Sequence, residues 1–195
     1  MNDVLADAGT QENEKTLLGF WIYLMTDVVL FATLFATYIV LRGNTNGGPS
    51  GAEIFDMSSV LIETIILLTS SFTAGLMALA ARRQDISQTL WWLLVTVLLG
   101  MAFLGMELSE FTKLASEGNG WSRSGFLSAF FTLVGTHGLH IFAGLLWAGV
   151  LFAQVVRKKL TNNVFRRLSL FGMFWHFLDI IWIFIFTIVY LMGVS

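Results

Sequence analysis

Five long apolar runs constrain the fold of this chain more than any other feature of its sequence. Each run is long enough to cross roughly 30 Å of bilayer hydrocarbon at a helical rise of about 1.5 Å per residue. A segment in lipid has to satisfy its backbone hydrogen bonds internally, and a helix does so within the segment. The sequence therefore predicts an all-α integral membrane protein, a bundle of five transmembrane helices. The expected spans are residues 18–41, 60–81, 90–111, 126–156 and 168–192.

The composition supports a membrane protein and excludes several other classes. Only 12% of the 195 residues are charged, whereas a soluble domain carries about 25%. The sequence contains no cysteine, so disulfides, thiolate metal sites and a cysteine nucleophile are excluded. The net charge of −2 and the lack of a basic run with interleaved aromatics argue against a nucleic-acid partner. We expect residues 1–17 to form a polar, frayed N-terminal tail and residues 18–195 to form a single five-helix membrane domain.

The distribution of lysine and arginine predicts how the bundle is oriented. The N-terminal tail and the second and fourth connections hold most of the basic residues, and the first and third connections hold the rest. The first group is Lys15, Arg82, Arg83, Arg157, Lys158, Lys159, Arg166 and Arg167, and the second is Arg42, Lys113 and Arg123. Because cytoplasmic loops carry the excess of positive charge, we expect a cytoplasmic N-terminus and a periplasmic C-terminus. On the outer side, Tyr38, Trp121 and Tyr190 are placed as interfacial anchors.

Five ionisable side chains fall into one membrane layer when depth is counted along each span. Asp27 lies about 14 Å from the cytoplasmic side of the first span. On the fourth span His137 and His140 lie about 16 and 21 Å from the outer side. On the fifth span His176 and Asp179 lie about 12 and 16 Å from the cytoplasmic side. Such groups are costly in lipid, so we expect this buried polar layer to face the interior of the bundle.

Three roles are open for this layer. Histidines and carboxylates are metal or haem ligand types, but the His-x-x-His and His-x-x-Asp spacings here differ from the Glu-x-x-His pairs of di-iron bundles. Intramembrane histidines and carboxylates also mark proton relays and ion pathways, although such a path needs polar positions at several depths. The third role is structural, in which the side chains satisfy one another and hold the helices in register. We favour the structural role and expect no metal.

A second group of carboxylates lies near the outer ends of two spans. Glu63 is close to the start of the second span, and Glu107 and Glu110 are close to the end of the third. The last two are three residues apart and share a helix face. We expect a hydrated rim in which these carboxylates pair with Lys113 or Arg123.

Four segments, taken in chain order, form a recognisable pattern. They are residues 19–31 (GFWIYLMTDVVLF), 109–111 (SEF), 130–140 (FFTLVGTHGLH) and 175–182 (WHFLDIIW). This pattern resembles the signature of subunit III of the haem-copper respiratory oxidases, with Asp27 at the position of that family's buried carboxylate, which is usually Glu in cytochrome c oxidases. The cytochrome c oxidase version generally has seven spans, and this chain lacks the first two. The five spans and residues 47–51 and 123–131 look closest to the subunit III of the cytochrome o (bo-type) ubiquinol oxidases.

The resemblance implies a function and a setting. The chain would be a non-catalytic accessory subunit of a proton-pumping terminal oxidase of the bacterial inner membrane, which oxidises ubiquinol and reduces oxygen to water. In such complexes haem and copper belong to subunit I, so no catalytic residue, metal or redox cofactor is expected in this chain. The implied roles are support of the catalytic subunit, retention of phospholipid in a helix cleft and upkeep of proton uptake. The implied partners are subunit I, the other subunits and membrane lipids.

Two other functions remain open at this point. One is subunit III of a cytochrome c oxidase with missing spans. The other is a stand-alone small proton-coupled transporter that uses the layer of Asp27 and the histidines as its proton site.

Overall fold

The computed structural model describes residues 2–194, and side chains from Glu14 to Gly193. Helices joined by loops are the only regular secondary structure in that range, with no strand among the described residues. The helices are α1 (Asn2–Leu41), α2 (Gly51–Ile54), α3 (Met57–Arg82), α4 (Ile86–Ser116), α5 (Gly125–Lys158), α6 (Asn162–Ile185), the π-helical segment η1 (Phe186–Leu191) and α7 (Met192–Val194). Five of these segments are long and apolar enough to cross a membrane, over residues 14–41, 57–82, 86–116, 125–158 and 162–191. The prediction of an all-α chain with five spans is confirmed.

The N-terminal segment differs from the expectation. Helix α1 begins at Asn2, so the expectation of a frayed tail over residues 1–17 is wrong for the part of it that the structure describes. The segment contains no proline and several good helix formers, so a helix already nucleated in the apolar run propagates through it.

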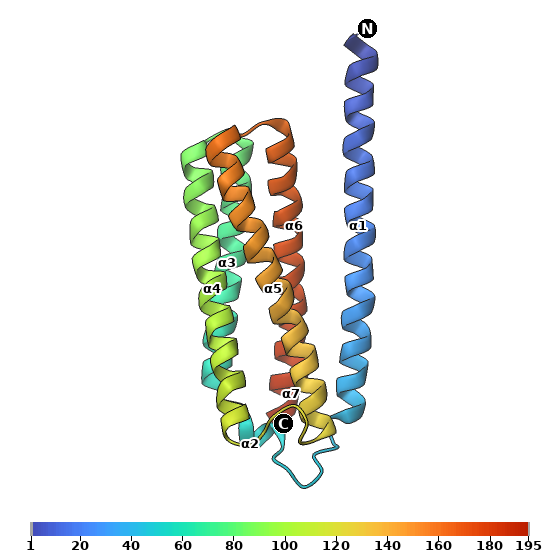
Figure 1. Ribbon diagram of the computed structural model, residues 1–195, viewed down its shortest axis with the longest axis vertical. Helices are drawn as coiled ribbons and strands as arrows, with labels where there is room; N and C mark the ends of the chain where they lie inside the picture. Colours follow the sequence, from blue (N-terminus) through green and yellow to red (C-terminus); the bar gives the residue numbers. More distant parts are fainter. Residues whose placement is uncertain (1, 195) are drawn as a thin grey trace.

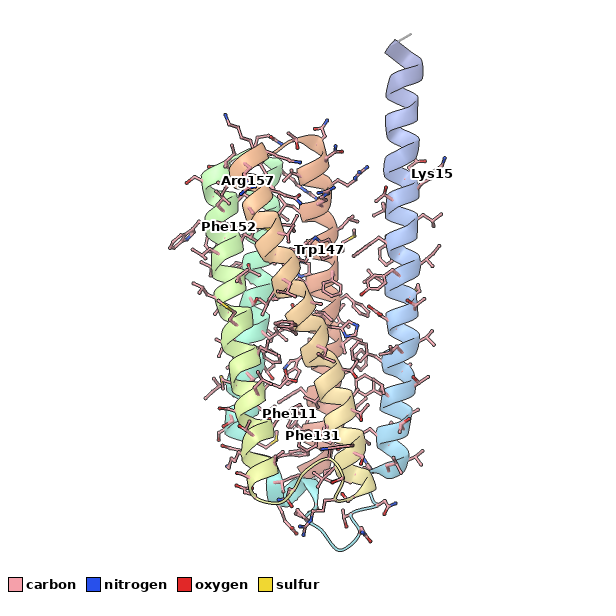
Figure 2. The ribbon with its side chains drawn as sticks, in the orientation of Figure 1. Lys15, Phe111, Phe131, Trp147, Phe152 and Arg157 are labelled. Carbon is pink, nitrogen blue, oxygen red and sulfur yellow. The ribbon has the colours of Figure 1, made fainter. Side chains whose placement is uncertain are left out.

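The five long helices lie side by side along the long axis of the molecule (Figure 1). Helices α3 to α6 form a four-helix unit, and α1 packs against α5 and α6 on one flank of it. Figure 1 shows that the N-terminal end of α1 extends beyond the ends of the other helices. Figure 2 shows Lys15 and Arg157 at similar heights near one end of the unit, and Phe111 and Phe131 near the opposite end.

Side chains cap the start of three of the long helices. The Asp56 carboxylate accepts from the Ser58 amide at 3.1 Å at the start of α3, and Asp85 accepts from the Gln88 amide at 3.0 Å at the start of α4. At the start of α5 the Ser124 hydroxyl accepts from the Leu127 amide. Each bond satisfies a backbone donor that the first helical turn leaves open. The hydrogen bonds from Ser59 and Ser58 lower the pKa of Asp56, so the α3 cap is ionised at neutral pH.

Helix α1 buries a single stripe of side chains against the rest of the bundle. Leu24, Asp27, Phe31 and Tyr38 lie on this stripe, and most of the residues between them are exposed. Spacings of three, four and seven residues keep these side chains on one helix face. At one end of the stripe the Tyr38 hydroxyl donates to the backbone carbonyl of Val189 at 3.3 Å. Asp27 therefore stands on the face that α1 turns toward the other helices over residues 14–41.

Two buried tryptophans of α6 join that helix to α3. The Trp175 Nε1–H donates to the Ser70 hydroxyl at 3.0 Å, and the Trp182 Nε1–H donates to the Thr64 hydroxyl at 3.1 Å. The Trp175 ring lies close to the Cα atoms of Gly100 and Gly144, where an added Cβ would come within 2.9 Å of it. The two glycines thus let α4 and α5 close on the indole from two sides.

Candidate functional site

Asp27 contacts His140 between α1 and α5. The Asp27 Oδ2 lies 3.7 Å from the His140 Nε2, too far for a direct hydrogen bond but within ion-pair distance. The other ring nitrogen of His140, Nδ1, lies 2.7 Å from the backbone carbonyl of Thr136. A carbonyl is only an acceptor, so Nδ1 carries a proton and donates this bond. The ring plane of Phe31 lies against His140 with 5.2 Å between ring centroids.

His137 has different surroundings although it lies one turn away on the same helix. Its side chain is completely buried, and neither ring nitrogen has a hydrogen-bond partner. The ring stacks on Trp182 at 5.3 Å between centroids and meets the edge of Phe103 at 5.9 Å. His137 therefore packs as an aromatic ring among side chains of α1, α4 and α6.

His176 and Asp179 lie at the contact of α6 with α3. The His176 Nδ1 is 2.6 Å from the Ser71 hydroxyl, and the His176 side chain is exposed on the surface of the bundle. Asp179 is 5% exposed, and neither of its carboxylate oxygens has a hydrogen-bond partner, although the Ser71 hydroxyl lies near them. Ser71 is the third polar residue of this group.

The five side chains of the predicted layer form three separate groups. Asp27 and His140 pair between α1 and α5, His137 lies in an aromatic environment, and His176 and Asp179 gather around Ser71. Within the described range, no hydrogen bond or ion pair links one group to another. In that range, no three His, Cys, Asp or Glu side chains are arranged so that they could hold a metal ion.

Two of the three outer carboxylates are buried in the bundle, whereas Glu110 is partly exposed and lines a pocket together with Lys113. Glu63 and Glu107 are only 2% and 1% exposed, so the expectation of solvated side chains is wrong for both. Glu110 accepts from the Tyr190 hydroxyl at 3.2 Å. Helix α4 continues to Ser116, beyond the apolar run that was expected to end at residue 111. Glu107 and Glu110 therefore lie further from the end of their helix than the apolar run indicated. Arg123, the second expected partner, donates to the backbone carbonyl of Gly118 instead.

Several residues of these sites were missed from the sequence. In the sequence, Ser71 is one of several small polar residues of a transmembrane run. Only the neighbouring Ser70 indicated that this part of the helix is polar. Tyr38 and Tyr190, expected as interfacial anchors, are 1% and 0% exposed and lie in the core. Trp121 is 71% exposed, as an interfacial anchor would be. A tyrosine near a helix end has the same local sequence in both situations, because burial is decided by other helices.

Comparison with known proteins gives the chain a family. The family model described as cytochrome c oxidase subunit III matches residues 6–194. The cytochrome bo(3) ubiquinol oxidase subunit 3 of Pseudomonas aeruginosa is 58% identical over 92% of this chain and 86% of its own length. The protein of the same name from Pseudomonas putida is 51% identical over 93% and 87%. The cytochrome c oxidase subunit 3 of Bacillus sp. is 45% identical over 94% and 89%.

These matches cover the whole membrane domain, and they agree with the five apolar helices of a multi-pass protein of the bacterial inner membrane. The resemblance of the four sequence segments is confirmed as well. This chain belongs to the cytochrome c oxidase subunit III family, the accessory subunits of the haem-copper oxidases.

Proposed function

We propose that this chain is subunit III of a terminal oxidase that oxidises ubiquinol, reduces oxygen to water and moves protons outward. The observation that carries the proposal is that the relatives at 58% and 51% identity both bear the name of a ubiquinol oxidase subunit. The relative named for cytochrome c is less similar, at 45%. Haem and copper would lie in subunit I, and this chain would act without a redox centre of its own.

The role of the chain in that complex is to support the catalytic subunit and to hold phospholipid. The buried polar layer supports a structural contribution, because each of its groups connects helices that are distant in sequence. Asp27 and His140 join α1 to α5, and His176 joins α6 to α3 through Ser71. Replacing one member of such a pair leaves a polar group without its partner in lipid, which is the costly outcome.

The stand-alone transporter is the weaker candidate. A proton path across the membrane requires polar groups that follow one another through its thickness. The three groups of the layer are separated by apolar and aromatic side chains such as Phe31 and Trp182. Family membership also favours a subunit of a larger complex.

The proposed orientation has the N-terminus in the cytoplasm and the C-terminus in the periplasm. The structure brings Lys15 and Arg157 near one end of the bundle, as the charge distribution requires (Figure 2). The excess of lysine and arginine at that end supports its cytoplasmic location.

The proposed contact surface for subunit I is the face of α6 and α3 around His176. This ring is exposed in the middle part of a transmembrane helix, where lipid offers it no hydrogen-bond partner. Its Nδ1 is bonded to Ser71, which leaves Nε2 for a group outside the chain. A neighbouring transmembrane helix with a polar side chain at this depth would satisfy it.

The function is tested by purifying the native complex through this chain. We expect haem to copurify, seen in a visible absorption spectrum, together with larger subunits and oxygen consumption driven by ubiquinol. Activity with reduced cytochrome c in place of ubiquinol would show that the chain is subunit III of a cytochrome c oxidase instead. A haem-free homo-oligomer with transport activity would overturn the proposal.

A further inference from the structure

Three carboxylates of α3 and α4 gather inside the bundle rather than at its surface. Glu63 comes from α3, and Glu107 and Glu110 come from successive turns of α4. The first two are 98–99% buried, and Glu110 is partly buried. The charges of the three groups act on one another, which places them in one cluster.

The surrounding backbone leaves room for this cluster. A Cβ on Gly138 of α5 would come within 2.7 Å of the Glu107 Oε1, so only a glycine lets the carboxylate occupy its position. On the other side the Tyr190 hydroxyl donates to the Glu110 Oε2. Tyr190 belongs to the π-helical segment η1, and π-helical turns are frequent at functional sites.

A pocket connects the cluster to the end of the bundle at α2. Its volume is about 350 Å³, enough for several water molecules, and its polar lining is Asp56, Ser59, Glu63, Ser109, Glu110 and Lys113. Asp56 and Lys113 are exposed, whereas Glu63 is buried, so the pocket runs from the surface to the cluster. Glu63 and Glu110 line the pocket, whereas Glu107 is not part of its lining. The Glu63 Oε2 and the Glu107 Oε2 are both buried and have no hydrogen-bond partner.

The charges around the pocket do not balance three ionised carboxylates. Lys113 is the one basic side chain in the lining, and Asp56 shares the pocket with it. The other titratable group in contact with the cluster is Tyr190 of η1, whose hydroxyl donates to Glu110. Buried carboxylates that lack a cation repel each other and lose hydration, so they are stable together only when they hold protons.

We propose that Glu63, Glu107 and Glu110 form a proton-binding site, in which the carboxyl groups share exchangeable protons and a small cluster of water reached through this pocket. The buried, unpartnered oxygens of Glu63 and Glu107 accept hydrogen bonds from a neighbouring protonated carboxyl, and the water contacts the carboxyl groups that line the pocket. Protons enter and leave by way of the water between Asp56 and Lys113. This proposal rests on residues of this chain alone, so it does not depend on the identity of the electron donor or of the partner subunits.

The test is infrared spectroscopy of the purified native complex in H₂O and in D₂O. Protonated carboxyl groups have a carbonyl stretch that ionised ones lack, and deuteration shifts it. We expect Glu107→Gln and Glu63→Gln each to remove intensity from this band. Glu117→Gln, at an exposed position past the end of the same helix, is the matched control and should leave the band unchanged. Equal intensity in all three variants would show ionised carboxylates and overturn the proposal.

Exchange and folding are checked separately. The band assigned by the variants should shift within the time of manual mixing into D₂O, because the pocket is open to water. A band that stays unshifted for hours would also overturn the proposal, since it would mean a sealed site.

The ratio of haem to this subunit monitors assembly, and Glu110→Gln, at the partly exposed position, replaces any variant that fails to assemble. Loss of the band after adding a small organic ammonium ion would assign the site to a cation and overturn proton sharing.

Discussion

His137 and His140 lie three residues apart on one face of α5, yet only one of them has a carboxyl partner. His140 contacts Asp27, whereas His137 is enclosed by Trp182, Phe103 and Phe31. The difference follows from where neighbouring helices cross α5. At the residue scale, Asp27 is therefore one half of a specific pair.

Replacing Asp27 with Asn exchanges the carboxyl of this pair for an amide and keeps the shape of the side chain. We expect the initial rate of oxygen consumption to stay close to that of the unchanged complex, while assembly or lifetime during turnover decreases. The change in stability should be about 1 kcal/mol, typical of a polar contact in a membrane bundle. Oxygen consumption and remaining activity are measured over repeated turnovers. Immediate and complete loss of turnover in an intact complex would give Asp27 a catalytic proton role instead.

A double substitution distinguishes the effect of the contact between Asp27 and His140 from the effects of the two residues taken singly. His140→Leu leaves the Asp27 Oδ2 buried without its partner, so we expect less assembled subunit in the membrane. Adding Asp27→Leu should recover part of the loss, because the buried carboxyl that has lost its His140 partner is then removed as well. The amount of subunit in the purified complex is the measurement. No recovery in the double variant would mean that each residue acts through other partners.

At the scale of helices, the packing around Trp175 depends on glycine. The indole lies between Gly100 of α4 and Gly144 of α5, and its Nε1–H is anchored on Ser70 of α3. One side chain of α6 thus fixes the distances to three other helices. The bundle has no freedom to absorb extra volume at this point.

Gly144→Ala tests this packing. The new Cβ would lie 2.9 Å from the Trp175 ring and 3.2 Å from Phe174, so we expect a loss of about 1–3 kcal/mol in stability, as for other overpacked cores. Gly149→Ala on the same helix is the matched control, since nothing lies within 4 Å of its Cβ position. Thermal denaturation of the solubilised complex is compared for the two. Equal midpoints would show that α5 and α6 can move apart at no cost.

The number and type of the helices could be predicted from the sequence because a lipid environment leaves an apolar run of this length few alternatives. The partners of Asp27, His137 and His140 could not be predicted, because rotation and tilt of each helix are set by packing that no local pattern records. Glu107 was misplaced for the same reason, as its burial depends on Gly138, far away in sequence.

At the scale of the whole molecule, labelling of introduced cysteines tests the proposed orientation of the chain in the membrane. The chain has no cysteine, so single cysteines can be introduced without background. Glu117→Cys, at the C-cap of α4, should react with a membrane-impermeant maleimide in intact spheroplasts. Lys158→Cys, at the end of α5, should react only after lysis. The opposite pattern would reverse the orientation.

The contact surface around His176 makes a further prediction. His176→Leu removes the exposed ring nitrogen together with the Nδ1 contact to Ser71, so we expect less subunit I to copurify with the chain. Ser71→Ala removes only the contact within the chain and should lower the ratio less. Leu139→Met, at a position on α5 that is 68% exposed, is the control for a change on another lipid-facing surface. Quantitative mass spectrometry of the purified complexes gives the ratio. An unchanged ratio for His176→Leu would place the contact with subunit I elsewhere.

The attachment of α1 also sets an order in time. Its hydrogen bond from Tyr38 to Val189 joins partners 151 residues apart. At a synthesis rate of roughly 5–20 residues per second, about 8–30 s pass between the two. Throughout this interval α1 is in the membrane before the carbonyl that anchors it has been made, and Asp27 likewise precedes His140. The first helix to be synthesised thus completes its contacts only when the last one has been made.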